Sequence, residues 1–192
     1  PFCHNSELLA GDVSYYDEAE IFAFLKKRRG VLEGVCVTGG EPTVYTDLDR
    51  FLRSVKELGY EVKLDTNGYL PDRLVPLISE RIVDYIAMDI KNSPDRYAES
   101  AGLAPERFDI NAIERSVEII MGSGVEYEFR TTVASELFTD ESMDGAARLV
   151  AGAKRYYLQN FVMRDTVPSK TLTTPHPSVM NRYLEIARRY VP

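Results

Sequence analysis

The sequence predicts an α/β fold built on a sheet of parallel strands, of the kind found in (β/α) barrels. Apolar runs of strand length alternate with amphipathic helical segments along the chain. Alternation of this kind is typical of βαβ units, which place their strands in a parallel sheet. The chain has 192 residues, of which 44% are hydrophobic, and this is enough for the core of one domain. We therefore expect residues 1–192 to form a single domain.

The elements can be assigned in chain order from their periodicity. A helix at 17–29 begins near Asp17 and ends at Gly30, and a short buried strand follows at 35–38. Cys36 in that strand is interpreted as a small buried hydrophobic residue. The other strands are expected at 61–65, 85–90, 125–133 and 156–162, and the other helices at 48–58, 72–80, 112–121, 140–151 and 178–189.

The first helix needs a strand before it, which would bring the number of strands to six. The sequence therefore predicts a partial (β/α)6 barrel whose first strand lies upstream of Pro1. Residues 92–109 are expected to form a long loop or a short irregular helix.

The overall composition excludes several classes of protein. The net charge is −7 and the basic residues are scattered, which argues against a nucleic-acid-binding face. No run of about 18 apolar residues is present, so no membrane span is predicted. Two cysteines do not make a disulfide framework. A cytoplasmic protein is expected.

The notable polar residues lie at or near the carboxyl ends of the predicted strands. In parallel α/β barrels ligands bind at that edge, because the loops that follow the strands converge there. Such positions hold Gly39, Gly40 and Glu41, then Asp65, Thr66 and Asn67, then Asp89 and Lys91, then Arg130 and Thr132, and finally Gln159.

Each of these groups also has a plainer interpretation. Gly39 and Gly40 let a ligand approach the backbone closely and Glu41 suits an ammonium group, but the same residues fit a tight turn with a surface glutamate. Residues 65–68 could form an ordinary Asn-Gly turn. Asp89 and Lys91 are two residues apart and face the same way on a strand, which also fits a structural ion pair.

Four stretches in order carry a family resemblance. They are PFCHN at 1–5, VTGGEPT at 37–43, KLDTNGYLPD at 63–72 and DYIAMDIKN at 84–92. Together they resemble the radical S-adenosylmethionine (radical SAM) superfamily. Within it the chain looks like the activating enzymes of glycyl radical enzymes, those of anaerobic ribonucleoside-triphosphate reductase and of pyruvate formate-lyase among them.

The resemblance implies a 4Fe–4S cluster and bound S-adenosylmethionine. Cys3 would be the last cysteine of a Cys-x-x-x-Cys-x-x-Cys motif whose other two members lie upstream of Pro1, so the chain as given would be inactive. Cys3 as cluster ligand and Lys91 are the implied catalytic residues. The implied cofactor-binding residues are Phe2, His4, Gly39, Gly40, Glu41, Asp65, Thr66, Asn67, Asp89, Lys91, Arg130, Thr132 and Gln159. The resemblance further allows a monovalent cation at Asp65, Thr66 and Asp89.

The implied function is reductive cleavage of S-adenosylmethionine, followed by removal of a hydrogen atom from a glycine of a partner enzyme. Anaerobic ribonucleotide reductase is the favoured partner, and a flavodoxin or ferredoxin is the expected electron donor. One alternative is a radical SAM enzyme that acts on a small molecule. A second is a cluster-free domain that binds S-adenosylmethionine or another protein without turnover.

Overall fold

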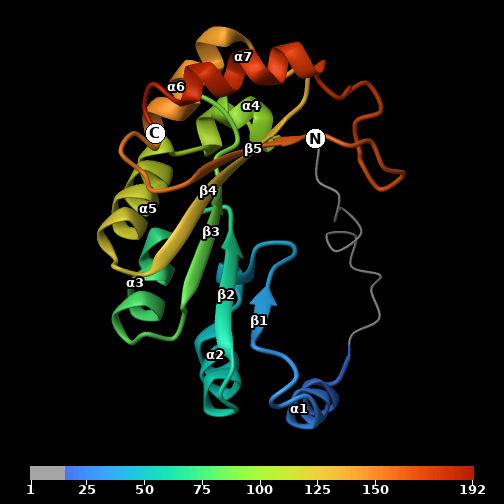
Figure 1. Cartoon of the computed structure of the whole chain (residues 1–192), viewed down its shortest axis with the longest axis vertical. Helices are drawn as coiled ribbons and strands as arrows, with labels where there is room; N and C mark the ends of the chain where they lie inside the picture. Colours follow the sequence, from blue (N-terminus) through green and yellow to red (C-terminus); the bar gives the residue numbers. More distant parts are fainter. Residues whose placement is uncertain (1–15) are drawn as a thin grey trace.

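The computed structural model describes residues 16–192 and contains one parallel sheet of five strands (Figure 1). The strands lie side by side in chain order, which confirms the predicted strand–helix alternation. Phe2, Cys3 and His4 lie outside the described residues. The strands are β1 (Gly34–Val37), β2 (Glu61–Thr66), β3 (Tyr85–Asp89), β4 (Glu126–Val133) and β5 (Tyr156–Asn160).

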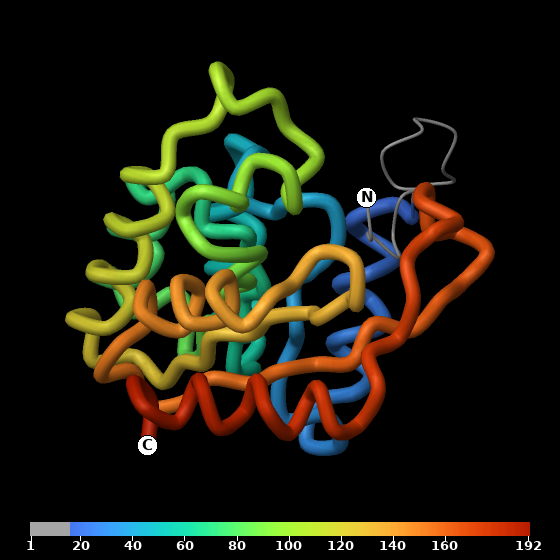
Figure 2. Tube along the Cα trace, turned by 90° about the horizontal axis from the view of Figure 1, so that it is seen from above, coloured from blue at the N-terminus to red at the C-terminus, as the bar shows by residue number. Residues whose placement is uncertain are grey.

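The sheet is curved, and most of the helices lie along its convex side (Figures 1 and 2). Helix α3 packs against α5, and α6 packs against α7. The other face of the sheet carries no helix among the described elements and forms the concave side of a partial barrel. The helices are α1 (Glu18–Lys27), α2 (Leu48–Glu57), α3 (Pro71–Ser79), α4 (Tyr97–Ala101), α5 (Ile110–Gly122), α6 (Asp140–Leu149) and α7 (Pro177–Ala187).

Side-chain alternation gives the two faces of the sheet opposite chemistry. On β2, Val62 and Leu64 are completely buried under the helices, whereas Lys63 and Asp65, which alternate with them, are half-buried on the concave side. The burial of β4 alternates in the same way over its whole length. Successive side chains of a strand point to opposite faces of the sheet. The register in which the strands pair therefore determines at once which residues form the apolar core and which form the polar concave face.

Strand β1 differs from the prediction of a buried strand. Its burial alternates between exposed and half-buried residues, and Cys36 is exposed. Within the described part of the chain, β1 pairs with β2 alone and its concave side has no helix over it. The apolar run around Cys36 therefore indicated a strand correctly but gave the wrong burial for this cysteine.

The connection from β3 to α5 is folded rather than open. Residues 92–109 contain two short 3-10 helices, η3 (Pro94–Arg96) and η4 (Pro105–Arg107), with α4 between them. The ring of Phe108 stacks on Tyr97 at 5.1 Å and on Tyr69 at 5.4 Å between centroids. This three-ring stack anchors the connection to the turn that follows β2.

The helix start predicted near Asp17 is confirmed, and α6 also begins at a side-chain cap. The Asp17 carboxylate accepts a hydrogen bond from the Ala19 backbone N–H at 2.8 Å and caps α1. Thr139 and Ser142 form a reciprocal capping box at the start of α6. None of the helices within residues 16–192 has both the length and the apolar character that a membrane crossing requires.

Candidate functional site

The loop that follows β1 brings Glu41 to the carboxyl edge of the sheet. Gly39 and Gly40 both have positive φ, at 89° and 50°, a conformation that favours glycine. A Cβ placed on Gly40 would meet no atom of residues 16–192 within 4 Å, so no described residue crowds the backbone at this point. Glu41 then caps the 3-10 helix η2 (Pro42–Val44), because its side chain accepts a hydrogen bond from the Thr43 backbone N–H.

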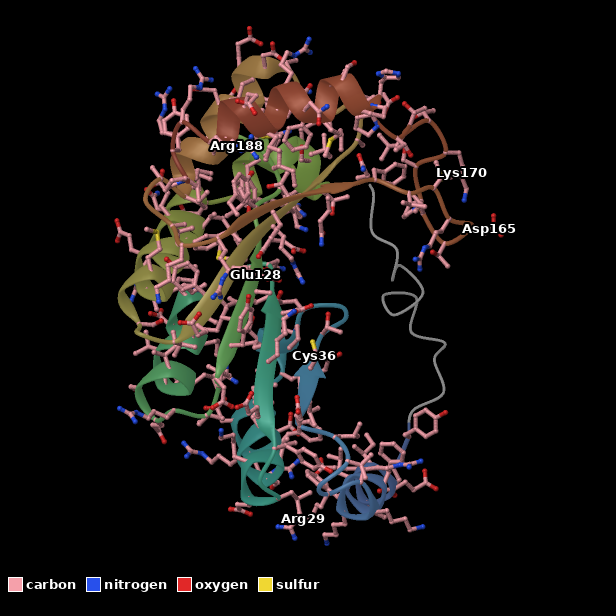
Figure 3. The ribbon with its side chains drawn as sticks, in the orientation of Figure 1. Arg29, Cys36, Glu128, Asp165, Lys170 and Arg188 are labelled. Atoms are coloured by element: carbon pink, nitrogen blue, oxygen red, sulfur yellow. The ribbon has the colours of Figure 1, made fainter. Side chains whose placement is uncertain are left out.

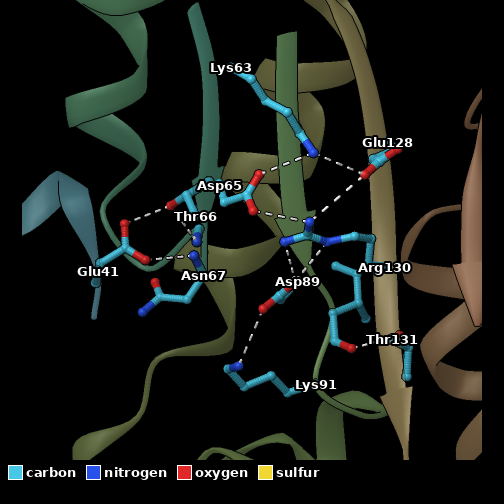
Figure 4. Close-up of polar contacts among 12 residues, drawn as sticks. Glu41, Lys63, Asp65, Thr66, Asn67, Asp89, Lys91, Glu128, Arg130 and Thr131 are labelled. Atoms are coloured by element: carbon cyan, nitrogen blue, oxygen red, sulfur yellow. Dashed lines mark hydrogen bonds and ion pairs between the residues drawn. The ribbon is translucent and has the colours of Figure 1, made fainter. Parts of the chain in front are cut away.

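Glu41 is a well-held carboxylate rather than a surface side chain (Figure 4). Its Oε1 accepts hydrogen bonds from Thr43 N at 3.1 Å, Thr43 Oγ1 at 2.5 Å and Thr66 Oγ1 at 2.8 Å. Its Oε2 accepts one from Asn67 N at 2.6 Å. Oε1 thus has three donors and Oε2 has one among the described residues, so Oε2 is the oxygen with capacity for a further donor. An ammonium group is a suitable donor for that oxygen.

The turn after β2 is an Asn-Gly turn that also holds Glu41. Asn67 Oδ1 accepts a hydrogen bond from Tyr69 N at 2.8 Å, and Thr66 Oγ1 accepts one from Gly68 N at 3.0 Å. Ser116 on α5 donates to the Gly68 carbonyl at 2.6 Å. The ordinary-turn interpretation is therefore correct as geometry, and the same turn supplies two of the donors that position the Glu41 carboxylate.

The concave face carries a row of charged side chains centred on Arg130 (Figure 4). Arg130 Nη1 lies 3.2 Å from Asp65 Oδ2, and Arg130 Nη2 lies 3.0 Å from Asp89 Oδ1. The Lys63 ammonium lies 3.4 Å from Asp65 Oδ1, and the Lys91 ammonium lies 3.8 Å from Asp89 Oδ2. Both aspartates thus have a cationic group at each of their oxygens, and Asp89 and Lys91 do form the ion pair that the sequence allowed.

Arg130 keeps its charge in this setting. Burial of the side chain, which is only 15% exposed, opposes the charged form, but Asp89 and Asp65 outweigh it and raise the pKa of the guanidinium. For Cys36, burial first and then the nearby Asp65 carboxylate raise the pKa of the thiol, and the opposing effect of Lys63 and Arg130 is smaller. A raised pKa disfavours the thiolate, which is the form of cysteine that reacts and binds metals.

Sequence reasoning missed the part of this row that lies nearer the amino ends of the strands, which is drawn at the top of Figure 4. Glu128 lies 3.7 Å from the Lys63 ammonium and 3.9 Å from Arg130 Nη1, and accepts a hydrogen bond from the Tyr85 hydroxyl at 2.8 Å. These residues lie within strands and not at strand ends, so the strand-end rule does not reach them. The available signal was spacing, because Lys63 and Glu128 stand two positions before Asp65 and Arg130 and so share their face.

The remaining predicted residues are placed as follows. Thr132 on β4 and Gln159 on β5 are register partners, which puts their side chains next to each other on the concave face. Arg130 is two residues before Thr132 and faces the same side. Cys36 lies on the same face further toward the amino ends of the strands (Figure 3). His176 caps α7, because its ring nitrogen Nδ1 accepts a hydrogen bond from the Ser178 backbone N–H at 3.3 Å.

The sequence model of the radical SAM superfamily matches residues 1–149. The chain belongs to the radical SAM superfamily. Membership implies S-adenosylmethionine and a 4Fe–4S cluster as cofactors, and the described residues fit the first of these. Glu41 has a free acceptor for an ammonium group, no described residue crowds Gly40, and Lys91 supplies a cation for a carboxylate. The cluster ligand Cys3 lies outside the described residues.

Two curated relatives are similar over most of this radical SAM chain. "Putative glycyl-radical enzyme activating enzyme MJ1227" of Methanocaldococcus jannaschii is 28% identical over 100% of the chain and 80% of its own length. The 7-carboxy-7-deazaguanine synthase of Thermococcus kodakarensis is 27% identical over 89% of the chain. The chain spans 62% of the length of that second relative.

Solved structures share the fold at low sequence identity. A domain of pyruvate-formate lyase-activating enzyme from Bacteroides vulgatus superposes with a TM-score of 0.61 at 18% identity, over 82% of this chain and 94% of that one. Streptococcus suis SuiB bound to its precursor peptide SuiA superposes with a TM-score of 0.70 at 17% identity, over 98% of this chain and 42% of that one. These likenesses support the radical SAM barrel architecture.

A monovalent cation fits the site less well than S-adenosylmethionine does. Asp65 and Thr66 are consecutive on β2 and point to opposite faces of the sheet. The Thr66 hydroxyl bonds to Glu41, whereas Asp65 bonds to Arg130. The space between Asp65 and Asp89 is spanned by the guanidinium of Arg130. The three predicted ligands are therefore not gathered around one vacant point.

Proposed function

We propose that this radical SAM chain activates a glycyl radical enzyme by removing a hydrogen atom from a glycine of that partner. The observation that carries the proposal is the similarity to the Methanocaldococcus jannaschii protein named as such an activating enzyme, which extends over the whole chain. Anaerobic ribonucleotide reductase is the partner that we favour, and a flavodoxin or ferredoxin is the proposed electron donor.

The cofactors supply the electron and the carbon-centred radical that takes the hydrogen atom, and the protein supplies binding and positioning. In the proposal Cys3 holds one iron of the cluster as a thiolate. Glu41 receives the ammonium end of S-adenosylmethionine, with Gly39 and Gly40 beside it, and Lys91 faces the carboxylate end. Phe2, Thr132 and Gln159 contact the adenosine part, and His4 also reaches the carboxylate end. Asn67 and Thr66 act by holding Glu41.

The connection between β3 and α5 is a suitable rim for a protein substrate. It follows directly on Lys91, and Tyr97 within it donates a hydrogen bond to the Asp89 carbonyl at 3.1 Å. Leu103 on the same connection is 44% exposed and gives an apolar contact point. A segment fixed to the site in this way can present a partner loop to it. The monovalent cation is not part of the proposal, because the Arg130 guanidinium spans the space between Asp65 and Asp89.

The test is radical formation in the partner. The intact natural protein would be loaded with iron and sulfide without oxygen, reduced, and mixed with S-adenosylmethionine and the partner enzyme. A glycyl radical signal in electron paramagnetic resonance is expected, together with 5′-deoxyadenosine. The two cysteines of the chain make a matched pair, since Cys3→Ala should lose the cluster and the signal while Cys36→Ala keeps both.

A second candidate is radical chemistry on a small molecule. It is favoured by the similarity to the 7-carboxy-7-deazaguanine synthase of Thermococcus kodakarensis. In that case the loaded protein would still cleave S-adenosylmethionine, but no glycine of any partner enzyme would carry a radical. Suppose the loaded protein converts a purine-like small molecule to a product while the partner enzyme acquires no glycyl radical. That result would support this candidate and exclude the activase function.

A further inference from the structure

Among the described residues, the charges of the row centred on Arg130 balance without any added ion. Three cationic side chains, Lys63, Lys91 and Arg130, stand against three carboxylates, those of Asp65, Asp89 and Glu128. All four oxygens of the two aspartates have a cationic nitrogen within 4 Å. An additional cation between them would give this half-buried group of side chains a net positive charge.

The Arg130 guanidinium also occupies the position between Asp65 and Asp89 that a bound ion would need. Its Nε and Nη2 both donate to Asp89 Oδ1, at 3.1 and 3.0 Å, and its Nη1 donates to Asp65 Oδ2 at 3.2 Å. The planar guanidinium can serve two carboxylates at once with directed hydrogen bonds, which a spherical ion cannot do. Asp65 Oδ1 has no hydrogen-bond partner in the described part of the chain, but the Lys63 ammonium stands 3.4 Å from it, so this oxygen also faces a cation.

We propose that the Arg130 guanidinium does the work of a monovalent cation in this protein, so that the S-adenosylmethionine end of the barrel functions without bound Na⁺ or K⁺. The guanidinium neutralises Asp65 and Asp89, holds β2, β3 and β4 together at their carboxyl ends, and stays charged at all physiological pH values. The inference concerns the binding of an ion and does not depend on which substrate the radical attacks.

The direct measurement is the binding of thallium(I), a monovalent cation close to K⁺ in size and charge. Binding is detected as a broadening of the thallium nuclear magnetic resonance line. The measurement would be made on the intact natural protein loaded with its cluster, with and without S-adenosylmethionine, at constant ionic strength. For the wild type we expect no saturable binding that K⁺ displaces. Replacing K⁺ by tetramethylammonium should also change the affinity for S-adenosylmethionine by less than about twofold, well below the roughly 5–150-fold typical of linked ligands.

Removal of the guanidinium should create the ion site. In Arg130→Met the same group of side chains carries a net negative charge, and we expect saturable thallium(I) binding, displaced by K⁺. In this variant K⁺ should tighten S-adenosylmethionine binding by roughly fivefold or more. Arg115→Met is the matched control, because it removes an arginine from an exposed ion pair with Asp72 on the helical side and should bind no ion.

Either of two results, one on the wild type and one on Arg130→Met, would overturn the inference. One is saturable, K⁺-displaceable binding to the wild type, with or without S-adenosylmethionine, that Asp89→Asn abolishes. The other is a folded Arg130→Met protein that binds no cation, which would mean that Arg130 does not occupy the place of one. If Arg130→Met fails to fold, Arg130→Lys serves instead, since its compact ammonium keeps the charge but cannot bridge both aspartates, and it should remain ion-free. Ion binding by Arg130→Lys would refute the charge-balance argument. A failed glycyl radical assay would leave all of these readings unaffected.

Discussion

The hydroxyl of Thr66 should contribute far more to the free energy of unfolding than an exposed hydroxyl does. Thr66 is 4% exposed, donates to Glu41 Oε1 at 2.8 Å and accepts from Gly68 N at 3.0 Å. Thr66→Val keeps the shape of the side chain and removes both hydrogen bonds. It leaves the Glu41 carboxylate with one donor fewer and the Gly68 N–H without its acceptor.

The size of the effect follows from these two contacts. A hydrogen bond to a charged group contributes about 1.5–3 kcal/mol, and a buried polar group left unsatisfied costs about 1–3 kcal/mol. The extra methyl group of valine recovers about 0.8 kcal/mol of this. We expect Thr66→Val to lower the free energy of unfolding by about 2–4 kcal/mol, or the melting temperature by roughly 5–15 °C for a chain of this length.

The assay is urea unfolding followed by circular dichroism, with Thr46→Val as the control. Thr46 is exposed in the loop after η2, so the same chemical change there should stay within about 0.5 kcal/mol of the wild type. Equal unfolding free energies for the two variants would refute the network around Glu41. Thr66→Val should also weaken S-adenosylmethionine binding, since it loosens the carboxylate proposed to receive the ammonium group.

Three further results are expected from elsewhere in the chain. Gly68→Ala should lower the free energy of unfolding in urea by at least about 1 kcal/mol more than Gly59→Ala does. Both glycines have positive φ, but only at Gly68 would the new Cβ come within 2.1 Å of the buried Met88 side chain. Asn92→Ala should lower the unfolding free energy by about 2–4 kcal/mol, because Asn92 is fully buried and its amide donates two hydrogen bonds; a loss under about 0.5 kcal/mol would contradict this. Burial raises the pKa of Tyr97 and of Tyr156, so their stabilisation is complete below the unfolded tyrosine pKa of about 10 and is lost as the pH rises above it. The phenylalanine variants should therefore lose less stability between about pH 10 and 12 than the wild type, as measured by urea unfolding across that range.

The order of elements could be predicted from the sequence because periodicity and caps are local. The five strands and the helix start at Asp17 follow from such signals. The end of β5 could not, since its apolar pattern continues to 162 while the last register pair joins Asn160 to Val133 at the end of β4. A strand ends where its partner ends, and that is a property of the sheet rather than of either segment.

The residues of the candidate site at the ends of strands could be predicted from the sequence, but those within strands could not. Glu41, Asp65 and Asp89 were found because they stand where strands end, and that position has a known consequence in parallel sheets. Lys63 and Glu128 stand inside strands, and the sequence does not say which face of the sheet lacks a covering helix. Cys36 shows the same limit, because its apolar neighbours suggested a core position while the strand turns its side chain to the concave face.

Strand alternation divides the site into two halves that are held independently. Thr66 joins the half made of Glu41 and the Asn-Gly turn, whereas Asp65, one residue earlier, joins the half centred on Arg130. Within residues 16–192, none of the hydrogen bonds and ion pairs described above joins a side chain of one half to a side chain of the other. The effects of Thr66→Val and Arg130→Met on the unfolding free energy should therefore add to within about 0.5 kcal/mol in the double variant. A larger coupling would mean that the β2 backbone between Asp65 and Thr66 transmits strain from one half to the other. In that case Glu41 would depend on the arginine row, and a single substitution in that row would disturb both ends of S-adenosylmethionine at once.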